Sequence, residues 1–328
     1  MRKMGFDEIW IKWIMGCVSS VTYSLLLNGQ PSGFIRPSRG IRQGDPLSPY
    51  LFLICAEGFS EMLRKVELRK SIHGIRICRG SPPVSHLLFA DDTMVFCKAS
   101  RKELAHVSDI LRDYRNASGQ LINLQKSAMF FSKNTGPILR SELSALMAIP
   151  VRADLGRYLG LPAENGKSKT ELFNYIKDKV VMSLAGWKEK LINQAGKEVL
   201  LLSMALTLPT YAMACFRLPE GLCHQIEAAM ARFWWGSKSC NDRKIHWMKW
   251  SRLCKEKFKG GLGFRSLTDY NLALLAKQGW RLMVSPKCLM ARVMKSKYFK
   301  DCDFMEARLG SNPSWMEKDH PSGNPDTE

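Results

Sequence analysis

The sequence predicts an α+β fold, on the strength of three observations. Between residues 19 and 135, short apolar runs with turn residues between them alternate with segments of helical periodicity, which indicates an antiparallel sheet backed by helices. From Thr170 onward almost every periodic segment is helical. The 328 residues, 45% of them hydrophobic, are enough for two or three compact domains.

The first segments predict a helix and a hairpin. Apolar residues recur at helical spacing within Phe6–Val18, so we expect an amphipathic helix there. Two strands are predicted at Tyr23–Leu27 and Gly33–Ile35, because the pair Asn28-Gly29 between them is a frequent hairpin turn.

A loop rich in glycine and proline follows at residues 40–49 and leads into a helix predicted from about Tyr50 to Lys70. Ser48 is expected to cap this helix, with Pro49 at its first position, where a missing N–H costs nothing. Such a loop before a helix suits a phosphate or a nucleotide, although the same composition is common in simple turns. Asp45 is expected to be a turn residue rather than a metal ligand.

Two adjacent carboxylates form the strongest local feature. The apolar runs Val84–Ala90 and Thr93–Cys97 predict two buried strands, and Asp91 and Asp92 are expected to form the two-residue loop between them. Adjacent carboxylates repel each other, so a rigid pair at a sheet edge suits divalent cations that bridge to a phosphate. The alternative is that aspartate is simply common in turns.

A helix and a further strand are predicted after this hairpin. Lys102–Ala117 has helical periodicity and Gly119 ends it. Alternation within Leu121–Phe131 predicts a strand on which Lys126 is a single cation, a pattern that is also typical of edge strands.

The second half is predicted to be helical and basic. Helices are expected at residues 170–185, 195–208, 221–235 and 268–284, a Lys-Gly-Gly-Leu-Gly turn at 259–263, and a disordered acidic tail after 310. The whole chain carries a net charge of +19, and residues 231–300 hold 17 basic against 3 acidic residues. A polyanion is the expected partner, with a solvated basic surface as the alternative.

Several classes of protein are excluded by composition. No apolar run is long enough to cross a bilayer, and no secretory signal is recognised, so we expect an intracellular protein without a membrane partner; nucleus and cytoplasm are not distinguished. The ten cysteines lack the spacing of a disulfide framework and are expected to be reduced core thiols. A zinc site is not expected, because Cys223, His224, Cys240, His246 and Cys254 are irregularly spaced.

Four blocks in this order resemble the reverse transcriptase domain of non-LTR (LINE-type) retrotransposons, especially the plant type. The blocks are Gly40–Phe52, Phe89-Ala90-Asp91-Asp92, Asn123–Ser127 and Tyr158-Leu159-Gly160-Leu161-Pro162. The resemblance covers about residues 1–300. It implies an RNA-directed DNA polymerase that uses Mg²⁺ or Mn²⁺ and takes an RNA template, a DNA primer and dNTPs.

The resemblance also implies residue roles and domains. Asp91 would be the main metal ligand and Asp92 the supporting one. Residues on the nucleotide and template side would be Arg42, Gln43, Gly44, Ala90 and Lys126, and the primer grip would comprise Tyr158, Leu159 and Gly160. The implied domains are a partial palm at 1–165, a helical thumb at 166–235, a basic connector at 236–310 and the tail at 311–328.

One departure from the family bears on activity. The family places a third catalytic aspartate in an upstream block of the form Phe-x-x-x-x-Ala-Tyr-Asp, and these 328 residues contain none. We therefore expect an N-terminally truncated chain that is inactive alone.

Two alternatives remain open. One is a non-catalytic nucleic-acid-binding relic that uses the basic block and its tryptophans, about half of which are expected in the core. The other is a structural remnant that does not fold, because its sheet edge and an apolar face would be exposed.

Overall fold

The computed structural model describes residues 1–38, 40–154, 156–162, 168–188, 192–236 and 244–307. The chain divides into two compact units, residues 1–76 with 83–153 and residues 77–82 with 154–328. Helices with small antiparallel sheets make up both, which confirms the α+β class. Among the residues with assigned positions, no helix is long and apolar enough to cross a membrane.

The first unit contains most of the strands. Its elements are η1 (Arg2–Met4), α1 (Glu8–Ser19), β1 (Tyr23–Leu27), β2 (Gln30–Ile35), α2 (Ser48–Leu68), β3 (His86–Phe89), β4 (Asp92–Val95), α3 (Arg101–Ser118) and α4 (Pro137–Met147). The predicted N-terminal helix and hairpin are confirmed. Asn28 and Gly29 form the β1–β2 turn with φ of 52° and 82°, the left-handed pair that this two-residue turn requires.

The antiparallel sheet expected within residues 19–135 is present only as separate small sheets. The described strands form three separate two-stranded antiparallel sheets, β1–β2, β3–β4 and a later pair. The strand expected at Leu121–Phe131 is replaced by a turn, because the carbonyl of Asn123 accepts the N–H groups of Lys126 at 3.1 Å and Ser127 at 3.0 Å. Only Met129 of this segment pairs like a strand residue, in an isolated bridge to Val151.

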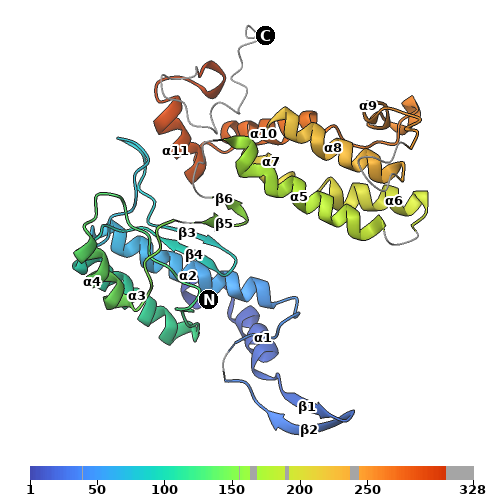
Figure 1. Ribbon diagram of the computed structural model, residues 1–328. Helices are drawn as coiled ribbons and strands as arrows, with labels where there is room; N and C mark the ends of the chain where they lie inside the picture. The colour runs from blue at the N-terminus through green and yellow to red at the C-terminus, as the bar shows by residue number, and fades with distance from the viewer. Residues whose placement is uncertain (39, 155, 163–167, 189–191, 237–243, 308–328) are drawn as a thin grey trace. The chain divides into compact units, whose positions relative to one another are not determined.

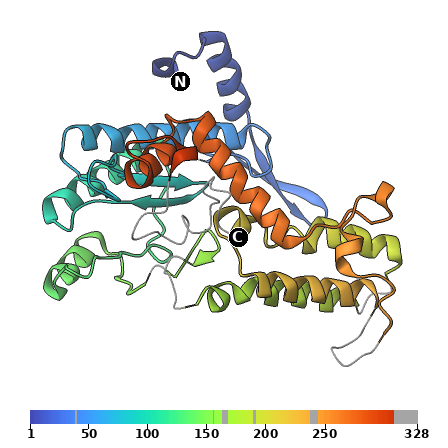
Figure 2. The same ribbon diagram turned by 90° about the horizontal axis from the view of Figure 1, so that it is seen from above.

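The β3–β4 hairpin is packed on α2 and α3. Figures 1 and 2 show the hairpin running alongside α2. Leu88 of β3 and Val95 of β4 pack against a buried cluster formed by Phe59, Leu63, Ile72, Val107 and Ile110. One apolar face of the hairpin therefore holds it against both helices.

Helix α3 begins and ends as its sequence predicts. Ser100 Oγ accepts the N–H of Glu103, and Gly119 ends the helix with φ of 75°. The Glu103 carboxylate is buried and accepts the backbone N–H groups of His73 and Lys98, each at 2.9 Å, while His73 Nδ1 lies 2.7 Å from its other oxygen. Burial alone would raise the pKa of Glu103, but these hydrogen bonds outweigh it and hold the pKa below its usual value.

The second unit is helical apart from one tight hairpin. Its elements are β5 (Arg157–Tyr158), β6 (Leu161–Pro162), α5 (Lys169–Lys188), α6 (Gln194–Leu200), η2 (Leu201–Ala205), α7 (Thr210–Cys215), α8 (Glu220–Trp234), α9 (Trp250–Leu253), η3 (Lys257–Lys259), α10 (Leu267–Val284), α11 (Leu289–Tyr298) and η4 (Phe304–Glu306). Helices α5 and α8 lie side by side over the large apolar core of this unit (Figure 1).

Three of the four helices expected in this unit are confirmed as α5, α8 and α10. The helix expected at 195–208 is wrong in part, because α6 ends at Leu200 and continues as the π-helical turn η2. The Lys-Gly-Gly-Leu-Gly turn is present: Gly260 has φ of 79°, and a Cβ on Gly261 would collide with the carbonyl of Lys255. The acidic tail lies outside the described residues.

A buried asparagine fastens α10 to the turn between α7 and α8. Asn271 is 2% exposed, and its Oδ1 accepts the N–H of Leu218 at 2.7 Å. Its Nδ2 donates to the carbonyls of Met213 at 2.7 Å and Phe216 at 3.0 Å. One amide thus satisfies three backbone groups where a helix end would otherwise leave them buried and unpaired.

We predict that Glu103→Gln lowers the free energy of unfolding of the first unit by about 1–3 kcal/mol at neutral pH, because an amide cannot accept all three hydrogen bonds. Since the folded pKa of Glu103 is lowered, its contribution is present above the pKa of the unfolded carboxyl and disappears as pH falls through the folded pKa. Urea unfolding of wild type and variant should converge in acid. Asp113→Asn, at an exposed position of the same helix, is the control, and a constant difference at all pH values would contradict the prediction.

We predict that Asn271→Leu destabilises the second unit by about 3 kcal/mol or more, because it leaves three buried backbone groups unpaired. Thermal unfolding followed by circular dichroism measures this loss. Lys277→Ala, on an exposed face of the same helix, should leave the transition nearly unchanged, and equal effects of both substitutions would refute the role of Asn271.

Candidate functional site

The two carboxylates lie at the tip of the β3–β4 hairpin. The antiparallel register pairs Phe89 with Asp92 and Leu88 with Thr93, so the two loop residues are Ala90 and Asp91. The expected loop of Asp91 and Asp92 is therefore displaced by one residue, and Asp92 begins β4. Ala90 adopts φ of 48°, which is uncommon for a residue with a Cβ and makes this turn a strained one.

Only one face of this hairpin is buried. Leu88 is half-buried on the core side, whereas Leu87 and Phe89 on the other face are 39% and 56% exposed. The expectation that both strands are buried is therefore wrong. Asp91 and Asp92 are exposed, so their oxygens are open to a ligand that approaches the tip.

The loop before α2 has its own internal hydrogen bonds. Asp45 Oδ1 accepts the N–H of Leu47 at 2.8 Å, which confirms Asp45 as a turn residue. Ser48 does not cap α2 as expected, because its hydroxyl donates to the carbonyl of Arg42 at 2.6 Å. Gly44 has φ of 85°, and its neighbours Arg42 and Gln43 are exposed. The loop is thus held by hydrogen bonds between its own residues, and the donor side chains of Arg42 and Gln43 are exposed to solvent.

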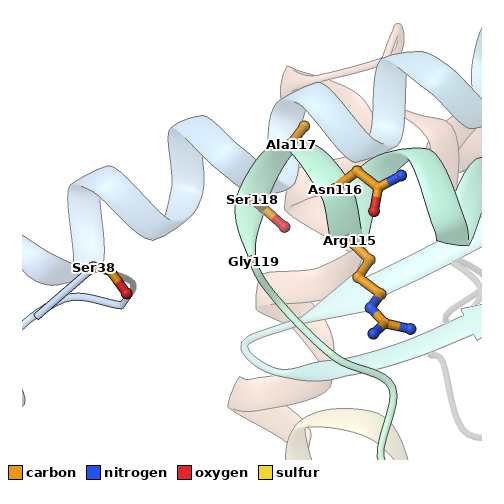
Figure 3. Close-up of a pocket in the computed structure, with 6 residues that line it drawn as sticks. All are labelled: Ser38, Arg115, Asn116, Ala117, Ser118 and Gly119. Atoms are coloured by element: carbon orange, nitrogen blue, oxygen red, sulfur yellow. The ribbon is translucent and has the colours of Figure 1, made fainter.

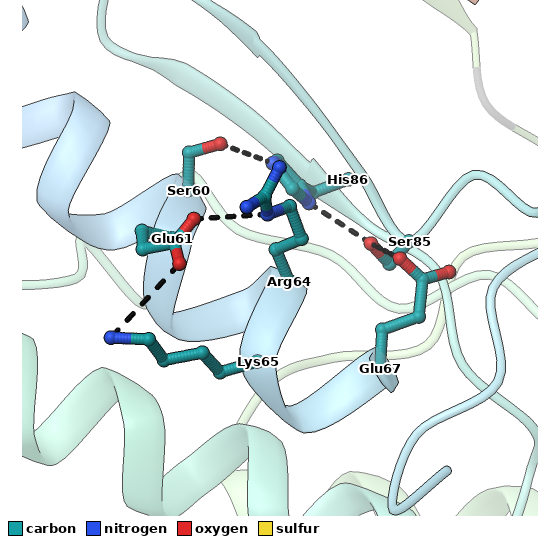
Figure 4. A network of polar contacts seen from close by, with 7 residues as sticks. All are labelled: Ser60, Glu61, Arg64, Lys65, Glu67, Ser85 and His86. Atoms are coloured by element: carbon teal, nitrogen blue, oxygen red, sulfur yellow. Dashed lines mark hydrogen bonds and ion pairs between the residues drawn. The ribbon is translucent and has the colours of Figure 1, made fainter. Parts of the chain in front are cut away.

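Two contacts set the direction of β3 on α2. Ser60 Oγ lies 2.8 Å from His86 Nε2, and the hydroxyl of Ser85 donates to Glu67 Oε2 at 2.9 Å (Figure 4). Residue numbers rise along β3 as they fall along α2, so the hairpin tip points toward the N-terminal end of α2.

From the contact between His86 and Ser60, β3 and α2 both extend toward the same end of the unit. Phe89, the last residue of β3, follows His86 by three residues, about 10 Å in extended chain at about 3.3 Å per residue, and Asp91 lies in the turn beyond it. Ser48 precedes Ser60 by twelve residues, about 18 Å in a helix at about 1.5 Å per residue. The carboxylates and the loop at the start of α2 therefore lie at the same end of the first unit.

His86 forms the middle of a polar chain. Its Nδ1 lies 3.0 Å from the hydroxyl of Ser85, whose own proton goes to Glu67. Burial lowers the pKa of His86, and the nearby carboxylates of Glu67 and Glu57 oppose this shift. Glu67 Oε1 is buried and has no hydrogen-bond partner among the described residues.

Lys126 and the block Tyr158-Leu159-Gly160 lie in different units. Lys126 is exposed, in the turn that begins at Asn123 of the first unit. Tyr158, Leu159 and Gly160 belong to the second unit, where Leu159 and Gly160 form the β5–β6 turn with φ of 51° and 80°.

The β5–β6 hairpin is fixed to α5. The hydroxyl of Tyr175 donates to the carbonyl of Gly160 at 3.1 Å, and the guanidinium of Arg157 lies 4.2 Å from the centre of the Tyr175 ring. Leu161 packs against the core of the second unit. The block is thus a rigid turn on a helical base.

The donor set at the hairpin suits Mg²⁺ in one respect. Mg²⁺ is commonly held by one or two carboxylates, waters and substrate phosphates, and Asp91 and Asp92 supply the carboxylates. Within the described ranges, no group of three His, Cys, Asp or Glu side chains is placed to hold a metal ion. A cage built from protein carboxylates alone is therefore not formed by these residues.

Two of the cysteines considered for zinc are kept as thiols by burial. Of the residues considered for zinc, Cys240 lies outside the described part of the chain. Burial raises the pKa of Cys223 to about 11 and that of Cys254 to about 12, which disfavours the thiolate that binds zinc. The described cysteines are free thiols, as expected, but Cys17 and Cys55 are exposed rather than in the core.

A polar pocket of about 350 Å³ lies elsewhere in the first unit (Figure 3). It is lined by Ser38, after β2, and by Arg115–Gly119 at the end of α3. None of these lining residues belongs to the predicted site.

Aromatic side chains of the basic block divide into core and surface. Trp234 is buried, and Trp235 and Trp250 are half-buried. Trp247 and Trp280 are 79% and 65% exposed. About half of these tryptophans therefore belong to the core, as expected, and the exposed ones remain open to a partner.

Four residues that attach the base of the hairpin to α2 were missed by sequence reasoning: Ser60, Glu67, Ser85 and His86. A usable signal existed, because residues seven apart on a helix share one face, and Ser60 and Glu67 are so spaced on α2. Ser85-His86 precedes the Asp-Asp pair in the sequence, but this spacing does not pair it with that face.

Comparisons with known proteins bear on this site. A family model described as reverse transcriptase (RNA-dependent DNA polymerase) matches residues 2–163, a range that includes the β3–β4 hairpin and the loop before α2. An uncharacterized mitochondrial protein of Arabidopsis thaliana is 48% identical over 111 residues, which cover 34% of this chain and 71% of that protein.

Two longer proteins are also similar. A putative ribonuclease H protein of Arabidopsis thaliana is 31% identical over 138 residues, 42% of this chain and 22% of that protein. A retrovirus-related Pol polyprotein from the type-1 retrotransposable element R2 of Popillia japonica is 27% identical over 184 residues, 53% of this chain and 25% of that protein. The chain thus spans about a quarter of the length of these two relatives.

We predict that Ala90→Gly leaves the β3–β4 hairpin intact or stabilises it by about 0.5–1 kcal/mol, because glycine adopts a positive φ without steric cost. Ala90→Val should destabilise it by about 1–2 kcal/mol, since a β-branched residue is least suited to this conformation. Urea unfolding of both variants measures the difference. Equal stabilities would show that the turn is not strained.

Proposed function

Because this chain belongs to the reverse transcriptase family, on its non-LTR retrotransposon branch, we propose that its functional centre is the nucleotidyl-transfer site of RNA-directed DNA synthesis. The observation that carries the proposal is the placement of Asp91 and Asp92 at an exposed hairpin tip, directed toward the glycine-containing loop at the start of α2. A carboxylate pair at the same end of the unit as such a loop suits a divalent cation bound to a triphosphate.

Each residue has a proposed role. Asp91 is the principal metal ligand and Asp92 the supporting one. Asp91 and Asp92 would hold Mg²⁺ or Mn²⁺. In a two-metal scheme one ion would acidify the primer 3′-hydroxyl and the other would stabilise the leaving pyrophosphate. The residues that contact nucleotide and template are Arg42, Gln43, Gly44, Ala90 and Lys126.

The loop and the turn differ in what they offer. Arg42 and Gln43 are exposed donors on a loop that its own hydrogen bonds hold closed, so they can contact phosphate or base without reordering that loop. The cation of Lys126 is also exposed and available to a phosphate. Ala90 has the smallest side chain that a chiral residue can place beside the carboxylates.

Residues of the second unit would contact the primer and the template. Tyr158, Leu159 and Gly160 form the proposed primer grip, a role that suits a turn anchored by Tyr175. We assign a partial palm to residues 1–165, a thumb to 166–235 and a basic connector to 236–310. The RNA template, the DNA primer and the dNTP are the proposed partners.

The number of carboxylates limits the proposed activity. These 328 residues hold no Phe-x-x-x-x-Ala-Tyr-Asp segment, and the described ones form no third ligand beside Asp91 and Asp92. Loss of one such electrostatic contribution commonly reduces a rate by about 10² to 10³. We therefore propose that the 328 residues on their own bind nucleic acid and metal but extend a primer little or not at all.

A second candidate function is nucleic-acid binding without chemistry. It is favoured by the exposure of Trp247 and Phe258, 79% and 82%, in the most basic part of the chain. Exposed aromatic rings among cations suit stacking on unpaired bases. The two functions differ in whether the carboxylates matter.

We predict that Asp91→Ala/Asp92→Ala weakens Mn²⁺ binding at least tenfold, because the variant loses both carboxylates that the described residues place at the hairpin tip. Calorimetric titration of the 328-residue chain with Mn²⁺ measures this change. Asp109→Ala/Asp113→Ala, which removes the same charge from exposed positions of α3 in the same unit, should bind Mn²⁺ like the wild type.

Primer extension on an RNA template, in Mg²⁺ and in Mn²⁺, then separates the candidates. Extension that only the Asp91/Asp92 variant lacks would show a working polymerase and overturn the proposed inactivity. No extension, with template binding that both variants retain and that falls steeply with salt, would favour the binding function. Unchanged Mn²⁺ affinity in the Asp91/Asp92 variant would refute the metal site itself.

A further inference from the structure

The β3–β4 hairpin is fastened to α2 by two kinds of contact. Leu88 and Val95 supply an apolar one, in the cluster around Phe59 and Leu63. Ser85, which precedes β3, and His86, its first residue, supply a polar one to Glu67 and Ser60 (Figure 4). The two differ in what they fix.

Apolar packing does not by itself set the position of a strand along a helix. It is non-directional, so Leu88 could meet a neighbouring turn of α2 with little change in buried area. Hydrogen bonds have narrow distance and angular limits. The contacts of Ser60 and Glu67, seven residues apart on α2, therefore fix the hairpin at one axial position.

One arrangement of protons forms every link of the polar chain with a neutral imidazole. The Glu67 carboxylate only accepts, so the hydroxyl of Ser85 donates to it. The oxygen of Ser85 then accepts from His86 Nδ1–H, and the free Nε2 accepts from the hydroxyl of Ser60. In this arrangement the imidazole is neutral, and burial, which lowers the pKa of His86, favours that form.

The charged groups that act on His86 both belong to α2. Glu57 and Glu67 of α2 are the carboxylates that act on it, and the linked groups of β3 and α2 are the neutral hydroxyls of Ser85 and Ser60. No further charged group of the described residues hydrogen-bonds to the imidazole. The ring thus acts as a neutral spacer of fixed length between β3 and α2.

We propose that His86 is a positioning residue for Asp91 and Asp92. Through Ser60 and the Ser85–Glu67 pair it fixes the axial position of β3 on α2, and so fixes the carboxylates relative to the loop at residues 40–49. The inference rests on the proposed function, because it gives the carboxylates a partner at that loop. It adds that metal and nucleotide affinity depend on a histidine that touches neither ligand.

Four variants test the proposal. His86→Asn keeps a donor near the place of Nδ1, for Ser85, and loses the contact with Ser60. His86→Gln keeps an amide near the place of Nε2, for Ser60, and loses the contact with Ser85. Ser60→Ala removes only the contact between Ser60 and His86. His106→Asn, at a half-buried position of α3 in the same unit, is the matched control. The readouts are amide hydrogen exchange, by NMR, and the affinity for Mn²⁺ by calorimetry.

We expect the amides of β3 and β4 to exchange about tenfold faster in His86→Asn, His86→Gln and Ser60→Ala than in His106→Asn. The amides of Val107 and Ile110 in the core of α3 should keep their protection. The affinity for Mn²⁺ should fall roughly fivefold in the same three variants.

Three results would overturn the proposal. Exchange at the level of His106→Asn would show that the chain does not hold the hairpin. Equally faster exchange at Val107 and Ile110 would show a general loss of stability instead of positioning. Faster hairpin exchange with wild-type Mn²⁺ affinity would show that the carboxylates do not depend on His86.

The Asp91→Ala/Asp92→Ala variant separates this inference from the proposed function. If Mn²⁺ affinity does not depend on the carboxylates, the proposed metal site fails, and hydrogen exchange alone then decides whether His86 positions the hairpin.

Discussion

The attachment of the β3–β4 hairpin to α2 is the constraint on which the first unit depends. A two-stranded hairpin is marginally stable by itself, and no third strand joins it among the described residues. Its order comes from one apolar face on the Phe59–Leu63 cluster and from the polar chain through His86. These contacts leave the opposite face and the tip exposed, so the carboxylates stay open to ligand while their base is fixed.

The second unit also has a hairpin whose base is fixed to a helix. There the β5–β6 turn is short and strained, with Leu159 at φ of 51°, and α5 holds it through Tyr175. In the same unit, Asn271 of α10 hydrogen-bonds three backbone groups between Met213 and Leu218 and so attaches α10 to the turn between α7 and α8. In both units a side-chain hydrogen bond from a neighbouring helix holds a hairpin in place.

Local signals made much of this fold predictable. Ser100 and Gly119 delimit α3, and Asn28-Gly29 sets the first hairpin, because caps and two-residue turns are determined by neighbouring residues. The strand expected after Gly119 failed because Asn123 closes a turn that alternation does not reveal. The carboxylate pair was visible in the sequence. The spacing of Ser60 and Glu67 could place both on one face of α2, but not pair that face with Ser85 and His86, since these residues meet only after α2 and β3 pack together.

The account depends on the carboxylates and the loop before α2 lying close enough to share one ligand. Paramagnetic broadening of backbone amide signals by substoichiometric Mn²⁺ tests this directly, because the effect falls steeply with distance from the ion. We expect signals of Thr93 and Met94 to broaden together with those of Gly44 and Leu47. Broadening confined to the hairpin, with the loop signals unchanged, would contradict the account.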